Sequence, residues 1–224
     1  YTVFKFFKYS LLLAFSHPHS THRSNPPQLP PRLSTPRNPS PMATQTAPEV
    51  RAKLLQQLSH AQQIMNYEEI GLYALQIVRS FVSNNHYTEA YAFVQTITFP
   101  SADQVNPTIF TAYTYYLALI SAVFLQYETA LRHLSLLLQG GDEVITEFHI
   151  HVYHLFIVVS LLTGQIPARS TFNIPVLAAN LNPLYFSLTQ AMRTGDLDKY
   201  LDILHDNAAM EVFEKDNMVQ FVPR

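Results

Sequence analysis

The chain has 224 residues with a formal net charge of −2, and it contains neither cysteine nor tryptophan. The absence of cysteine excludes a disulfide framework, a thiolate metal site and a cysteine nucleophile. The five glycines lie too far apart to form a dinucleotide-binding loop or a phosphate-binding loop. Charged residues make up 13% of the chain, against about 25% in a usual soluble domain, so we expect much of its surface to be buried.

Acidic and basic residues are distributed unevenly along the chain. Residues 1–48 contain five basic residues and no acidic one, whereas residues 49–224 contain nine basic and sixteen acidic residues. The second part therefore has a net charge of −7. Non-specific nucleic-acid binding needs clustered Lys and Arg to displace counterions, so we expect no nucleic-acid partner.

Residues 1–48 are predicted to form a disordered, proline-rich leader. Nine of the 15 prolines lie between Pro18 and Pro48, a density that forbids helix and sheet. The first residues resemble a secretory signal, but no small-residue cleavage site follows them; a transit peptide is the second interpretation, because the segment has Arg and Ser and no acids. We prefer a third, in which translation starts at Met42, since the chain begins with Tyr1 and its composition then changes abruptly.

Helical periodicity dominates from Glu49 onward. Apolar residues recur at helical spacing in the segments 50–65, 67–83, 87–94, 107–123 and 127–138. Asn84-Asn85 and Gly140-Gly141 are predicted to end two of these helices, and Asn106-Pro107 begins one as an N-cap followed by proline. No segment shows the sustained alternation of a strand. The sequence therefore predicts an all-α fold, a right-handed stack of antiparallel helix pairs similar to a TPR or HEAT solenoid.

A short pattern occurs twice in this helical part. Tyr87-Thr88-Glu89-Ala90 and Tyr127-Glu128-Thr129-Ala130 lie forty residues apart, a spacing typical of helix-turn-helix repeats. In each, the tyrosine is expected to fill the gap between paired helices, and the small alanine lets their backbones approach. Gly195 and Asp196 indicate a third junction of this kind, with Asp196 as the N-cap.

The apolar run 144–162 approaches the length of a membrane span. It includes Glu147, His149, His151 and His154, which would be costly in lipid, so we expect a helix packed between two layers of helices and no membrane partner. Glu147, His151 and His154 share one helical face that could hold a metal ion. We prefer histidines at a packing seam and predict neither a metal nor a cofactor.

An acidic stripe, Asp196, Asp198, Asp202 and Asp206, follows the third junction. Paired carboxylates can act as general acid and base, but only in a pocket that shifts one pKa, so we interpret the stripe as a solvated helix face. The sequence has no G-x-S-x-G element, no Walker motif and no zinc-ligand spacing. We therefore expect neither enzymatic activity nor a small-molecule substrate.

Three stretches, in this order, resemble one family. They are YYLALISAVFLQYETALRHL (115–134), FIVVSLLTGQIPARSTF (156–172) and LYFSLTQAMRTGDLDKY (184–200). The family is that of the third non-ATPase subunit of the proteasome regulatory particle, PCI-domain proteins of the 26S proteasome lid. The resemblance runs from about residue 70 to the end of the chain. It assigns a structural or interaction role to Tyr127, Ala130, Gly164, Ile166, Pro167, Arg169, Leu188, Ala191, Gly195, Asp196, Leu197 and Tyr200.

The resemblance implies a non-catalytic scaffold in ubiquitin-dependent protein degradation. Its expected partners are the other lid PCI subunits and the lid deubiquitinase assembly, in the cytoplasm and nucleus. The alternative is a PCI subunit of another complex: the COP9 signalosome, translation initiation factor three or an mRNA export complex. Residues 49–182 would form the helical repeats of the PCI module, and residues 183–224 would begin its core, with the family's winged helix missing.

The same comparison suggests which surfaces of the chain meet other proteins. The acidic stripe and Tyr115, expected to be exposed, are the candidate contact residues. Family members continue beyond the point that matches Arg224, so we expect an uncovered apolar face around Met218, Phe221 and Val222. Such a face would make the chain prone to aggregation on its own, because an open repeat stack needs polar caps.

Overall fold

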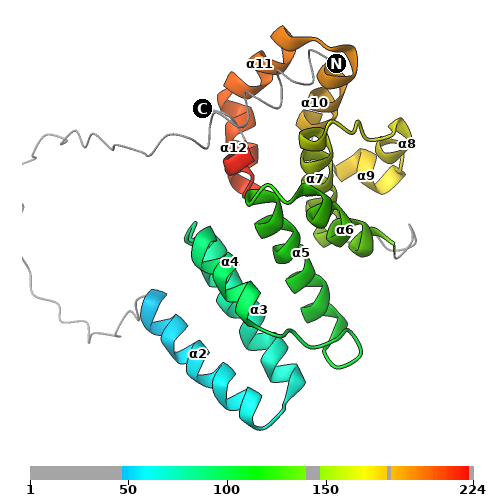
Figure 1. Cartoon of the computed structure of the whole chain (residues 1–224). Helices are drawn as coiled ribbons and strands as arrows, with labels where there is room; N and C mark the ends of the chain where they lie inside the picture. Colours follow the sequence, from blue (N-terminus) through cyan, green and yellow to red (C-terminus); the bar gives the residue numbers. More distant parts are fainter. Residues whose placement is uncertain (1–46, 140–146, 181–182, 222–224) are drawn as a thin grey trace, which may run out of the picture.

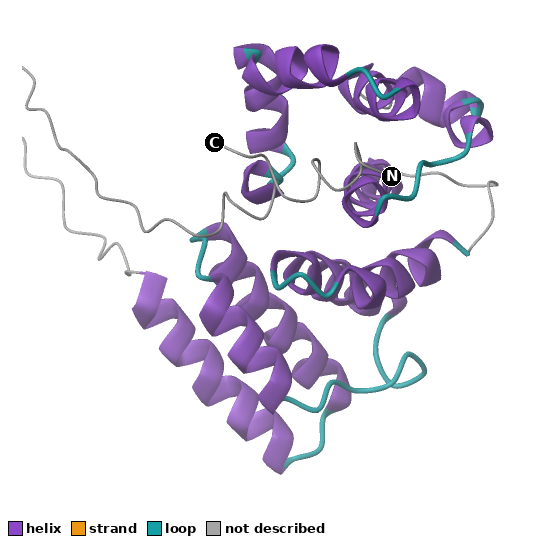
Figure 2. Cartoon of the chain, turned by 45° about the horizontal axis from the view of Figure 1, so that its top comes forward, coloured by secondary structure: helices purple, strands orange, loops and turns teal. Residues whose placement is uncertain are grey.

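A computed structural model describes residues 47–139, 147–180 and 183–221 (Figure 1). Figure 2 shows helices and connecting loops, and no strand, in these ranges, so the all-α prediction is confirmed. The predicted leader lies outside the described residues, except for its last two residues, which begin the first helix. The helices are α2 (Ala47–Gln63), α3 (Tyr67–Ser83), α4 (Tyr87–Thr96), α5 (Pro107–Val123), α6 (Tyr127–Leu138), α7 (Glu147–Thr163), α8 (Arg169–Phe172), α9 (Pro175–Asn180), α10 (Pro183–Thr194), α11 (Leu197–His205) and α12 (Asn207–Lys215), followed by the 3₁₀ helix η2 (Val219–Phe221).

Helices that are close in sequence pack against each other. The helix α2 contacts α3, α3 contacts α4 and α5, and the series continues through α5, α6 and α7. The helix α7 also contacts α10, which leads to α11 and α12. In Figure 1, α10, α11 and α12 form an arch that brings α12 back to the end of α5. The described chain is therefore a stack of antiparallel helix pairs, as predicted.

The helix α7 lies inside this stack. It has 17 residues, and its buried side chains include Val152, Leu155 and Val159. Three described helices, α5, α6 and α10, contact it, which explains why it is apolar nearly all round. Among the described helices, none has both the length and the hydropathy that crossing a bilayer needs.

Six helix ends share one chain reversal. A residue with positive φ ends each helix, and the next N–H donates to the carbonyl five residues earlier, which is the Schellman arrangement. The donor–acceptor distances of these six bonds lie between 2.7 and 3.0 Å. Gly195 occupies the positive-φ position in one reversal, at the junction predicted from the sequence, and Gly164 occupies it in another. The other four use Met65, Asn85, Leu125 and Asn217.

The repeated pattern seen in the sequence follows directly from these reversals. One residue after each of four reversals comes an N-cap, and the next residue begins α3, α4, α6 or α11. Ala90 and Ala130, at the fourth helical position, are fully buried. Tyr67 also begins a helix, α3, after such a reversal, but it is 42% exposed and Ile70 takes the place of the alanine. Asn106 caps α5 and Asp196 caps α11 through their side chains, as predicted.

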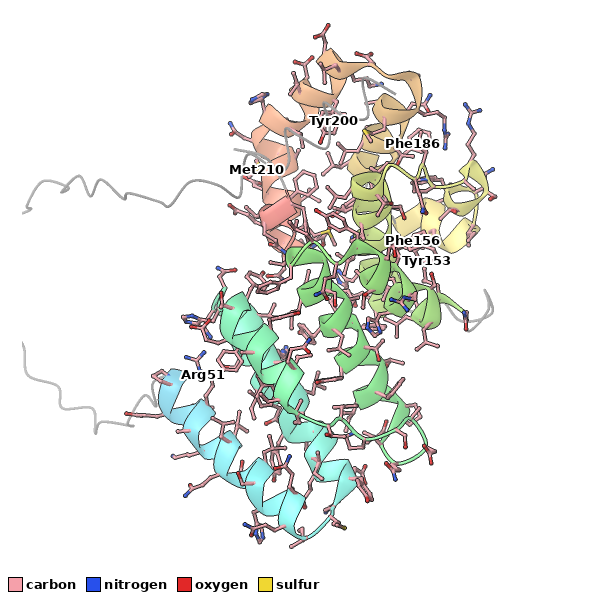
Figure 3. All side chains as sticks on the ribbon, in the orientation of Figure 1. Arg51, Tyr153, Phe156, Phe186, Tyr200 and Met210 are labelled. Atoms are coloured by element: carbon pink, nitrogen blue, oxygen red, sulfur yellow. The ribbon has the colours of Figure 1, made fainter. Side chains whose placement is uncertain are left out.

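The N-terminal helix α2 is fastened by a smaller apolar cluster of its own. Leu58 and Ala61 pack there with Ile70 and Ile77 of α3. The guanidinium of Arg51, labelled in Figure 3, also lies 4.9 Å from the centroid of the Phe81 ring, a cation–π contact between α2 and α3. These contacts hold the first pair together in addition to its reversal.

The end of the described chain is covered, contrary to prediction. Met218 is fully buried and Phe221 is 5% exposed, because the chain after α12 folds back onto the main core. The sulfur of Met218 lies 3.7 Å from the hydroxyl of Tyr185 in α10. The expected apolar face is therefore absent at these two residues, and Val222 lies outside the described residues, as does the predicted helix end at Gly140-Gly141.

Candidate functional site

The first family motif forms the junction between α5 and α6. Tyr127 begins α6 and is half-buried, and burial raises the pKa of its hydroxyl. Ala130, one turn later, is fully buried and lets the two helices approach. Both residues thus lie at the helix junction, Tyr127 partly and Ala130 fully buried.

The second motif forms the connection that leaves α7. Gly164 ends the helix with φ of 84°, a left-handed conformation that costs glycine little. Ile166 is half-buried and Pro167 is buried, whereas Arg169 begins the short helix α8 and is exposed. Of the predicted residues here, Arg169 is therefore the most accessible to a partner.

The third motif forms the junction between α10 and α11. Leu188 and Ala191 are buried in the main core, and so is Tyr200, which is labelled in Figure 3. Gly195 has φ of 72°, and the side chain of Asp196 accepts a hydrogen bond from the backbone N–H of Lys199 at 3.0 Å. Leu197 packs against the same core. These residues build the junction, and of them Gly195 and Asp196 are also exposed at the surface.

A hydrogen bond joins the second and third motifs. Nη2 of Arg193, near the end of α10, donates to the backbone carbonyl of Pro167 at 2.7 Å. Arg193 stands in the third motif, but it was not among the residues singled out from the sequence. Its role depends on a contact between segments 26 residues apart, which no local pattern reveals.

The acidic stripe and Tyr115, the two candidate contact sites, differ in their exposure. All four aspartates of the acidic stripe are exposed, which confirms the solvated face, and Asp206 also caps α12 through the N–H of Ala208. Tyr115 is half-buried rather than exposed, so the predicted exposure of this residue is wrong. Its ring packs edge-on against Tyr116 and Phe148, with centroids 5.7 and 5.8 Å away, and burial raises the pKa of its hydroxyl.

A buried polar cluster joins α7, α10 and the end of α12. The hydroxyl of Tyr185 donates to Oδ2 of Asp216 at 2.6 Å. Nδ1 of His154 lies 2.9 Å from the same oxygen, and Nδ1 of His151 lies 3.6 Å from Oδ1. The rings of His154 and Tyr185 stack with centroids 4.2 Å apart. His154 is thus at a packing seam, as predicted.

The electrostatics of this cluster favour an ionised carboxyl. Burial alone would raise the pKa of Asp216, but contacts with His154, Tyr185 and His151 outweigh it and hold that pKa below its usual range. Burial raises the pKa of Tyr185, and the bond to Asp216 adds to this. Glu147, which shares the helical face in the sequence, is exposed and does not belong to the cluster. Asp216 was missed because it lies 62 residues from His154.

The fold and its junctions define a helical repeat protein of the TPR type. The family model described as "PSMD3-like, N-terminal TPR repeats" matches residues 42–189, and the chain belongs to this family.

Three curated relatives support this assignment. The 26S proteasome non-ATPase regulatory subunit 3 of Dictyostelium discoideum is 31% identical over 79% of this chain and 34% of its own length. The probable 26S proteasome regulatory subunit rpn3 of Schizosaccharomyces pombe is 35% identical over 57% of this chain and 26% of its own length. The probable subunit 3 of Anopheles stephensi is 32% identical over 66% and 29% respectively. The chain thus spans about a third of these relatives, or less.

Proposed function

We propose that the chain acts as a non-catalytic scaffold in the lid of the 26S proteasome regulatory particle, in support of ubiquitin-dependent protein degradation. The match of the subunit 3 family model to residues 42–189, whose described part consists of stacked helices, carries this proposal. The relatives are named as regulatory subunits, and a regulatory role agrees with motif residues that build helix junctions.

Such a scaffold would act by holding its partners at fixed positions. Six described helix ends carry the backbone reversal, and apolar packing joins neighbouring helices, so the stack would hold fixed positions along its length. The bond from Arg193 to Pro167 extends this order to the connection between α7 and α10. Partners would then be held at fixed separations along one arm.

We propose the exposed face of α11 as one contact surface for other lid PCI subunits and the deubiquitinase assembly. Asp198 and Asp202 are exposed there, and Leu201 between them is 37% exposed. Charge at the rim of an interface acts mainly on association rate and partner choice. The face is therefore suited to a partner with basic residues around an apolar contact.

The direct test is affinity purification of the tagged full-length protein from its own cells, followed by mass spectrometry. We expect lid subunits among the recovered proteins. Recovery of COP9 signalosome, initiation factor three or mRNA export subunits instead, or of no lid subunit, would overturn the proposal.

A charge-reversal pair tests the surface separately. Asp198→Lys with Asp202→Lys should reduce lid recovery several-fold, because it reverses the exposed charge without touching the core. The matched control is Glu68→Lys with Glu89→Lys, two exposed acids on α3 and α4. Equal recovery from both double variants would remove α11 from the interface and leave the scaffold role standing.

The cellular location stays a proposal of the same kind. We propose the cytoplasm and nucleus, because a lid subunit would be found wherever the 26S proteasome assembles. Fluorescence of the tagged full-length protein, compared with a tagged lid subunit, tests this directly. Confinement to a different compartment would contradict it.

A further inference from the structure

The buried polar cluster places three metal-binding side chains together. One ligand atom from each of His151, His154 and Asp216 lies within 4.8 Å of the others. The two histidines are three residues apart on α7, so their rings project from the same side of the helix. Asp216 reaches them from the C-cap of α12. We propose that these residues form a structural site for a divalent transition-metal ion of the zinc class.

His154 is the first reason to place an ion here. Its side chain is 6% exposed, and both ring nitrogens are buried without a well-aligned hydrogen bond to any described residue. Nδ1 lies near the Asp216 carboxylate but outside good hydrogen-bond geometry. Buried polar atoms almost always have partners. A metal ion bound between the two groups satisfies a ring nitrogen and the carboxylate at once.

The surroundings of Asp216 are those of a metal ligand. Ligating carboxylates are normally oriented by a hydrogen bond from a neighbouring group. The Tyr185 hydroxyl provides one at 2.6 Å to Oδ2, and Tyr185 is itself fixed by full burial and by stacking on His154. Oδ1 is left facing His151, at 3.6 Å from its Nδ1.

The donor set indicates which ions fit. Imidazole and carboxylate together suit zinc, and they also suit nickel and copper, whereas calcium and magnesium prefer oxygen ligands alone. The side chain of His151 is 41% exposed, which gives the ion a path from solvent. Three protein ligands leave a fourth position for water in a tetrahedral site.

The location gives the ion a structural task. It would connect the middle of α7 to the end of α12, the point at which the chain turns back to bury Met218 and Phe221. This inference does not depend on the proposed lid function. It also differs from the face considered in the sequence, because Asp216 takes the place of Glu147.

The test uses the tag-free 224-residue chain, stripped with a chelator, and Zn²⁺ as the probe. Calorimetric titration should show one ion per chain, and the melting temperature should rise with free Zn²⁺ because the ion binds the folded state. Co²⁺ should give the visible absorption of a four-coordinate site. Absence of stoichiometric binding would overturn the proposal.

Two ligand variants and one control variant decide whether the bound ion occupies this site. His151→Ala changes a partly exposed ligand and should weaken Zn²⁺ binding at least tenfold, while the metal-free circular dichroism spectrum stays unchanged. His149→Ala, two residues away on the same helix and outside the cluster, is the matched control and should bind as the original chain does. Asp216→Asn is a second ligand variant. Unweakened binding by His151→Ala would show that the ion binds elsewhere and overturn the site.

Discussion

Arg193 and Pro167 are joined by a hydrogen bond of 2.7 Å from a guanidinium nitrogen to a backbone carbonyl. The carbonyl belongs to the connection after α7, and the guanidinium belongs to the last turn of α10. Pro167 is buried, so its carbonyl has limited access to water. The bond therefore converts two motifs that are separate in the sequence into one structural unit.

Removing this bond should loosen the connection. We expect Arg193→Ala to lower the free energy of unfolding by about 1–2 kcal/mol, because a charged donor is lost and a buried carbonyl is left without it. Urea denaturation measures this, and hydrogen exchange of segment 165–172 should increase. Arg169→Ala, at an exposed position of the neighbouring motif, should change stability by less than about 0.5 kcal/mol. Equal effects of the two variants would contradict the prediction.

The reversal at Leu125 offers a stabilising change. Leu125 has φ of 62° and is 43% exposed, so its side chain contributes little packing in a conformation that is costly for any residue with a Cβ. Leu125→Gly should raise the free energy of unfolding by about 0.5–1 kcal/mol. Thermal denaturation provides the measurement. Leu125→Val, which adds β-branching at the same position, is the opposite control and should lower the melting temperature.

Gly71 in α3 is required by close packing rather than by its backbone angles. A Cβ at this position would lie 2.8 Å from Cγ1 of Val105, in the connection before α5. Val105 is buried and β-branched, so it cannot easily move away. Gly71→Ala should therefore destabilise the chain by about 1 kcal/mol or more, even though alanine favours helices.

A double-mutant cycle tests the cause of that loss. In the background of Val105→Ala the added methyl has room, so Gly71→Ala should become neutral or stabilising. The expected coupling energy is about 1–2 kcal/mol. Additive effects of the two substitutions would show that the cost arises elsewhere.

Both the hydroxyl and the ring of Tyr185 should contribute to the free energy of unfolding. Tyr185→Phe keeps the stacking on His154 but removes the donor to a buried carboxylate, so we expect a loss of about 1.5–3 kcal/mol. The control is Tyr91→Phe, whose hydroxyl accepts a hydrogen bond from Gln126 at an exposed site. That loss should be below about 1 kcal/mol. Chemical denaturation of both variants gives the comparison.

The free energy of unfolding should depend on pH through His133, which lies in α6. Burial lowers the pKa of this side chain below its ordinary value of 6.5, and neighbouring Arg132 adds to the effect. The unfolded chain then binds the proton more readily, so the contribution of neutral His133 is present above about pH 6.5 and is lost as the pH falls below it. His133→Gln should reduce the loss of stability between pH 7 and pH 5, measured by urea denaturation. An unchanged pH dependence would contradict this.

Local signals in the sequence were sufficient to predict the main helices and several of their caps. Asn106, Asp196 and Gly195 occupy their predicted positions because capping depends on residues a few places apart. Met65 and Leu125 gave no signal, since long apolar residues rarely adopt positive φ; here they do so within the hydrogen-bonded reversals.

Errors occurred where distant segments meet. Tyr115 was expected on the surface, but Phe148 of α7 covers its ring. Met218 was expected to be uncovered, but it packs beneath Tyr185 of α10. Asp216 had no apparent role until the fold brought it to His154. In each case the deciding partner lies more than thirty residues away, beyond the reach of periodicity.

The shared reversal does not require one particular residue at the helix ends. The hydrogen bonds of the reversal join backbone atoms alone. Its positive-φ position is occupied by four kinds of residue: Met, Asn, Leu and Gly. Side-chain identity at the corners can therefore vary while the corner angle is retained. The length of each helix and its buried stripe, rather than a fixed corner residue, set the direction in which the next pair extends.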